Sequence, residues 1–109
     1  MKLFIAKIND EKSVDPILKN MASYSILDPV IIDCTGMDSE IKEYNGSLLG
    51  SLRVMFEKDR KFAKLIAVII EDKMLESAVK AVEEVTGDLN ESKENNKCIC
   101  IPLDYTKGI

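Results

Sequence analysis

Residues 62–87 read FAKLIAVIIEDKMLESAVKAVEEVTG and contain the two hydrophobic patterns that decide the fold. The first, at residues 63–70, is an almost unbroken aliphatic run rich in Val and Ile, which is typical of a strand buried on both faces. After Glu71 and Asp72 the apolar residues recur every three or four positions, as on one helix face: Leu75, Ala78, Val79, Val82 and Val85. Gly87 then provides a left-handed helix stop. The stretch predicts a central strand followed by a helix that folds back over it.

The N-terminal part of the chain predicts a similar strand-helix-strand unit. Residues 3–8 (LFIAKI) and 30–35 (VIIDCT) have the composition of strands. Ser13 is the predicted helix cap, and Pro16 is expected in the first helical turn, where no amide donor is required. Between the two strands, the helical stripe comprises Val14, Ile17, Leu18, Met21 and Ala22.

The order of these elements predicts an α+β, ferredoxin-like βαββαβ fold with a four-stranded antiparallel sheet, formed by one domain over residues 1–109. The last strand, residues 98–103, contains Pro102 and is therefore expected at a sheet edge. Right-handed crossovers place both helices on one face of the sheet. The first and third strands are apolar on both faces, so the second sheet face is left uncovered. An exposed apolar face of that size predicts self-association through the sheet.

Composition narrows the class of protein. The chain of 109 residues is 46% hydrophobic and 31% charged, as in ordinary soluble domains, and no stretch is long and apolar enough for a membrane span. The N-terminal residues lead directly into a strand pattern instead of a signal peptide, which predicts a cytoplasmic protein. The net charge of −4 argues against a general nucleic-acid binder.

The absence of histidine excludes histidine triads, histidine metal sites and histidine acid–base catalysis within one chain. No nucleophile–base pair or carboxylate dyad emerges, so an enzyme is not expected, although Asp33 is a candidate buried acid. Cys98 and Cys100 share one strand face and, with Cys34, have two interpretations. They form a thiolate metal site or they are buried free thiols. The second interpretation is favoured because paired Cys-x-x-Cys spacing is absent.

The segment 37–61 between the two halves is long for a compact domain, and loops of this length are often functional. Ser47 begins a predicted short amphipathic helix within it. This helix either packs on its own domain or a sister subunit, or it is a docking surface for a partner protein. Its apolar stripe consists of Leu48, Leu49, Leu52, Met55 and Phe56.

The chain resembles the PII and PII-like signalling proteins, most clearly over residues 64–103. The resemblance rests on a strand ending in paired acids (LIAVIIED), a helix closing in EEVTG, and a lysine leading into a strand that finishes in proline (KCICIPL). The opening MKLFIAKI and the second strand running into Thr35 and Gly36 are also compatible. The resemblance implies a compact homotrimer whose inner walls are the sheets. It also implies that the loop 37–61, the T-loop of that family, signals to a transporter, enzyme or regulator.

The same resemblance implies that an adenine nucleotide or another small effector binds in clefts between subunits. The matching ligand-binding positions are Gly36, Lys64, Thr86, Gly87 and Lys97. Where PII proteins have a short glycine-rich loop before the lysine, this chain has DLNESKENN, which contains no glycine and argues against the usual ATP site. The effector is therefore a different nucleotide, a small anion or absent. The alternatives are a protein-interaction module without effector and a metal-binding trimer similar to the CutA family.

Overall fold

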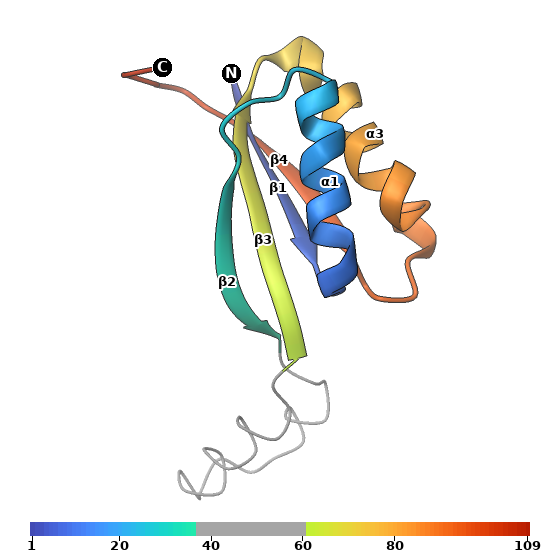
Figure 1. Ribbon diagram of the computed structural model, residues 1–109. Coiled ribbons are helices and arrows are strands. Elements are labelled where there is room, and N and C mark those ends of the chain that lie inside the picture. Colours follow the sequence, from blue (N-terminus) through green and yellow to red (C-terminus); the bar gives the residue numbers. More distant parts are fainter. Residues whose placement is uncertain (37–60) are drawn as a thin grey trace, which may run out of the picture.

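The computed structural model describes residues 1–36 and 61–109, which form a four-stranded antiparallel sheet with two helices on one face (Figure 1). The strands are β1 (Lys2–Ile8), β2 (Val30–Gly36), β3 (Lys61–Ile70) and β4 (Lys97–Pro102). The helices are α1 (Glu11–Ser23) and α3 (Leu75–Thr86), and short 3₁₀ turns lie at η2 (Asp72–Met74) and η3 (Leu89–Glu91). This arrangement confirms the predicted ferredoxin-like α+β fold.

The order of the strands across the sheet is β2-β3-β1-β4. The long aliphatic strand β3 is central, as its composition predicts, and pairs with β2 on one side and β1 on the other. β4 pairs only with β1 and is an edge strand that ends at Pro102. A proline at this position removes an amide donor where no further ladder bond follows.

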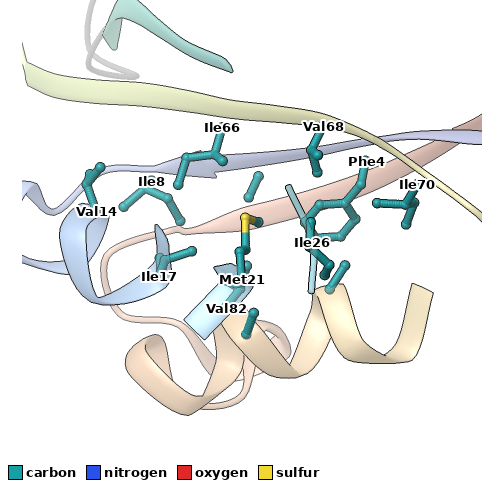
Figure 2. Packing of buried hydrophobic residues seen from close by; sticks show 13 residues of the cluster. Phe4, Ile8, Val14, Ile17, Met21, Ile26, Ile66, Val68, Ile70 and Val82 are labelled. Carbon is teal, nitrogen blue, oxygen red and sulfur yellow. The ribbon is translucent and has the colours of Figure 1, made fainter. Parts of the chain in front are cut away.

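The hydrophobic core fills the layer between the sheet and the two helices. Alternate residues of β1 and β3 face the helices, where Phe4, Ile8 and Ile66 are fully buried. In Figure 2, Ile17 and Met21 of α1 and Val82 of α3 extend from the helices toward these strand residues. Most of the predicted helical stripes face the core: Val14, Ile17 and Met21 on α1, and Ala78 and Val82 on α3 are buried. Ala22 of the predicted α1 stripe is exposed, and Ala81, which the predicted α3 stripe lacks, is buried.

The helix α1 begins two residues before the predicted cap. Asp10, not Ser13, is the N-cap, and its Oδ1 accepts the backbone N–H of Lys12 at 3.1 Å. Ser13 is buried and donates its hydroxyl to Asp10 Oδ2 at 2.9 Å. A carboxylate at a helix N-terminus gains from the helix dipole as well as from the hydrogen bond, so Asp10 is the better cap. Pro16 consequently lies inside the helix instead of in its first turn.

The segment between the helix α3 and β4 is more ordered than its polar sequence predicts. It contains η3, and Leu89 packs against the hydrophobic core. Gly87 ends α3 with a φ of 80° and a ψ of −174°, so the predicted left-handed stop is wrong in detail. The positive φ is present, but the ψ is extended, which is a conformation essentially restricted to glycine. None of the helices in the described ranges is long and apolar enough to cross a membrane.

Candidate functional site

The sheet face that points away from the helices is the main candidate site, and we call it the open face. Residues directly opposite each other in an antiparallel pair share a face, so the strand registers define its members. They are Leu3, Ile5 and Lys7 on β1; Val30, Ile32 and Cys34 on β2; Ala63, Leu65, Ala67 and Ile69 on β3; and Lys97, Ile99 and Ile101 on β4. Lys61 of β3, opposite Gly36, continues this face at its end, and Lys7, Lys61 and Lys97 are the only charged residues at these positions of the described strands.

The open face leaves large aliphatic side chains in contact with water. Val30, Ile32, Ile69, Ile99 and Ile101 are between 42 and 58% exposed. They come from three strands and form rows that continue through the partly buried residues of β1. Isolated exposed aliphatic residues are ordinary, whereas a contiguous patch of this kind marks an interaction surface. Within the described residues both helices lie on the other face, as the sequence predicts for α1 and α3 (Figure 1).

Among the predicted effector residues, Lys64 lies on the helix-facing side of β3. Its Nζ is 3.5 Å from Oδ1 of Asp33, the residue directly opposite it on β2. Asp33 is exposed, so the interpretation of this residue as a buried acid is wrong. The reason is that β2 is an edge strand, and its helix-facing side extends beyond the cover of the two helices. The positions of both charged side chains are explained by this solvent-exposed ion pair between neighbouring strands.

Thr86 and Gly87 lie at the end of α3, and their polar groups are used within the chain. The Thr86 hydroxyl contacts two backbone carbonyl oxygens, those of Val82 at 3.2 Å and Gly87 at 2.9 Å. The following turn is held by Glu83, whose Oε2 accepts the backbone N–H of Leu89 at 2.9 Å. The Glu83 carboxylate therefore already accepts the Leu89 N–H, which a bound anion at this turn would otherwise accept.

Lys97 begins β4 and lies directly opposite Lys7 of β1. Both lysines belong to the open face, next to Leu65, which is the partner of Lys7 on β3. Lys7 is not among the predicted effector residues. Its place on this face could have been predicted from the sequence, because Leu3, Ile5 and Lys7 alternate along β1.

The five predicted effector residues do not meet within one chain. Gly36 pairs with Lys61 at one edge of the sheet, while Lys97 starts the strand at the other edge (Figure 1). Four strands separate these edges by about 14 Å. Lys64 and Lys97 also lie on opposite faces, because Lys64 shares its face with Ile8 and Lys97 shares its face with Lys7. Any site that uses all five needs residues from another copy.

The three cysteines are free thiols and also lie on different faces. Cys34 is opposite Ala63 on the open face, whereas Cys98 and Cys100 are opposite Ala6 and Phe4 on the helix-facing side. Three thiolates from one chain therefore do not converge on one metal ion. Burial raises the pKa of the Cys98 thiol, and the negative charge of Glu83 and the neighbouring Cys100 raise it further. A raised pKa favours the protonated thiol, which is neither a metal ligand nor a nucleophile.

The predicted partner-binding helix lies outside the described residues. Its members are Leu48, Leu49, Leu52, Met55 and Phe56, all within residues 37–60. The structure nevertheless shortens the predicted loop by one residue, because β3 begins at Lys61.

The described residues define a ferredoxin-like domain with one helix-covered and one exposed sheet face. No protein-family model matches the sequence, and no curated protein matches it either.

Proposed function

We propose that this protein is a non-enzymatic, PII-like regulatory domain that works as an assembly of identical copies. The observation that carries the proposal is the exposed aliphatic open face, which a second copy can cover. Burying one Ile or Val side chain contributes about 1.5–3 kcal/mol, and five such side chains are available on each copy. The resemblance to PII proteins makes a homotrimer the expected assembly, with the open faces directed inward.

In this proposal the assembly also creates the effector sites. Gly36 and Lys64 belong to the β2 side of the sheet, and Thr86, Gly87 and Lys97 belong to the α3 and β4 side. When the β2 side of one copy lies beside the β4 side of the next, the two sets meet in a cleft between copies. A small effector bound there, such as an adenine nucleotide or another anion, would act on the adjoining segment 37–61. That segment is the proposed contact with a partner protein.

A second candidate function is a protein-interaction module without an effector. Two observations favour it. Lys64 already pairs with Asp33, and the Thr86 hydroxyl is already bonded to backbone carbonyl oxygens. Two of the expected ligand-binding groups are thus satisfied without a ligand. In this alternative the chain still assembles through the open face, but only residues 37–61 carry the biological contact.

Two measurements test these functions. Sedimentation velocity over a range of protein concentrations measures assembly, and we expect a trimer; a monomer at all concentrations would rule out the proposal. Thermal unfolding with a panel of nucleotides and small anions then separates the two candidates. A ligand at about 100 times its dissociation constant stabilises the folded state by about 2.7 kcal/mol. An assembled protein that no ligand stabilises would support the module without effector.

A further inference from the structure

The two edges of the sheet run in opposite directions. Among the described residues, β2 pairs only with β3, and β4 pairs only with β1. Every neighbouring pair in the order β2-β3-β1-β4 is antiparallel, so β2 and β4 point opposite ways along the sheet. When two copies lie side by side with their helices on the same face, β2 of one copy is therefore antiparallel to β4 of the next. The two edges can join without either sheet being turned over.

The open-face side chains of the two edges match in spacing. Val30 and Ile32 on β2 are exposed and two residues apart, and so are Ile99 and Ile101 on β4. One antiparallel register places Val30 opposite Ile101 and Ile32 opposite Ile99, and cross-strand pairs of this kind stabilise sheets. A shift by two residues in either direction leaves only one such pair. The same register places Pro29 opposite Pro102, so both residues without an amide donor fall at one end of the pairing.

The helix-facing side of the same two edges offers a second fit. Ile31 lies on the helix-facing side of β2, opposite the buried Ile66, yet it is 40% exposed because the helices do not cover this edge. Covering the open face would leave Ile31 in water. At the other edge of the sheet, the outer surface of α3 has a shallow hollow lined by Leu75, Glu76, Val79 and Lys80.

This hollow lies on the side of α3 that is nearer β4. The other side of α3 contacts α1, where Asn20 Nδ2 donates to the carbonyl oxygen of Ala81 at 3.1 Å. Glu83 follows Val79 by four residues and so shares its side of the helix, and Glu83 is close enough to β4 for its charge to act on Cys98. In the register above, Ile31 of the next copy lies opposite Cys100, on the side of β4 where the hollow is.

We propose that copies of this chain join edge to edge, with β2 of one copy paired antiparallel to β4 of the next in this register. The inference rests on the proposed self-association and specifies how the strands meet. Each copy uses both of its edges in the same contact, so a ring that closes leaves no strand edge unpaired. The open faces stay on one side of the joined sheet, and their burial favours placing them inside the ring, with the helices outside.

An engineered disulfide tests the register, because the pairing places Cys34 of one copy opposite Lys97 of the next. Opposed residues of antiparallel strands have Cα atoms about 4.5–5.5 Å apart, within the range that a disulfide spans. In a single chain these two residues lie on opposite edges of the sheet, about 14 Å apart, which is too far. We expect Lys97→Cys, oxidised with diamide, to give covalent multimers on a non-reducing gel. Mass spectrometry should identify the bond between Cys34 and position 97.

Two further variants separate edge pairing from self-association in general. Lys93→Cys, at an exposed position in the turn before β4, is the matched control and should not link to Cys34. Ile31→Lys should weaken assembly by about tenfold or more in sedimentation velocity, although Ile31 is not on the open face. An assembled Lys97→Cys protein without the bond to Cys34, or with Cys34 linked to Cys34, would overturn the edge pairing and leave self-association intact. A protein that stays monomeric at all concentrations would overturn both.

Discussion

The side-chain Oδ1 of Asn96 accepts the backbone N–H of Asn9 at 2.8 Å and joins two parts of the chain that are 87 residues apart. Asn9 in turn donates its side-chain amide to the carbonyl oxygens of Glu94 and Asn95, at 2.8 and 3.0 Å. Asn96 is 2% exposed, and its own backbone N–H donates to Ser92 Oγ at 3.0 Å. These bonds fix the end of β1 to the turn that leads into β4, so they set where Lys97 begins its strand.

Substitution of Asn96 by alanine tests this link. The change leaves the Asn9 N–H without an acceptor in a partly buried place, and we expect a loss of about 1–3 kcal/mol in the free energy of unfolding. Urea denaturation monitored by circular dichroism measures it. Asn95→Gly is the matched control, because Asn95 has a φ of 60° that glycine adopts without strain. A loss below about 0.5 kcal/mol for Asn96→Ala would show that the link contributes little.

Substitution of Gly87 by alanine tests the backbone at the end of α3. An added Cβ meets no atom within 4 Å, so only the positive φ opposes the change. We expect a destabilisation of about 1–3 kcal/mol from backbone strain alone, measured by the same denaturation. Gly108→Ala is the control, since Gly108 also has a positive φ but lies in the C-terminal tail, which can relax. Equal effects of the two substitutions would contradict a specific requirement at position 87.

Substitution of Ile99 by lysine tests the open face as the surface of assembly. Ile99 is 55% exposed in the centre of β4, so a lysine there should leave the fold intact. We expect assembly to weaken by about tenfold or more, because the change removes apolar contact and adds a charge to the interface. Leu27→Lys is the control at a residue that is 68% exposed but lies outside the strands. Sedimentation velocity reports assembly, and circular dichroism verifies folding. Unchanged assembly of Ile99→Lys would exclude the open face.

The fold is predictable from the sequence because its strongest signals are local and periodic. The aliphatic run of β3 and the helical stripe of α3 lie side by side in residues 62–87, and each specifies one element. The cap of α1 is less predictable, since Asp10 and Ser13 are both good acceptors three residues apart. The choice depends on where the chain leaves β1, which Asn9 fixes through its bonds to the turn before β4.

The burial of Asn96 could not be predicted from the sequence. The stretch DLNESKENNK is polar throughout, and nothing local distinguishes Asn96 from its neighbour Asn95. The side chain of Asn96 is buried and accepts from the distant Asn9, whereas the side chain of Asn95 is exposed. The scatter of the predicted effector residues over two edges and two faces of one sheet has a related reason. Their positions along the chain do not specify which edge or face of the sheet each one occupies, and that information comes from the strand order.

The hydrogen bond between Tyr24, the C-cap residue of α1, and Glu84 of α3 predicts a response to alkaline pH. The Tyr24 hydroxyl donates to Glu84 Oε1, and this bond, with some desolvation and the negative charge of Glu84, raises the tyrosine pKa above its ordinary value near 10. A group with a raised pKa in the folded state stabilises fully below its unfolded pKa, and the stabilisation is lost as pH rises through the folded pKa. We therefore expect the unfolding midpoint to fall above pH 10. Tyr24→Phe should reduce that fall, and an unchanged alkaline profile in this variant would contradict the assignment.

The position of Cys98 predicts that its thiol reacts more slowly than an ordinary cysteine. Its pKa is raised by burial, by Glu83 and by Cys100, so at pH 8 the fraction of reactive thiolate is below that of an unperturbed thiol. Alkylation with iodoacetamide, followed by mass spectrometry of each cysteine peptide, should label Cys98 more slowly than a reference thiol in an unfolded peptide. The control is the same protein unfolded in urea, in which the difference should disappear. Rapid labelling of Cys98 in the folded protein would show that its place beside the core does not protect the thiol.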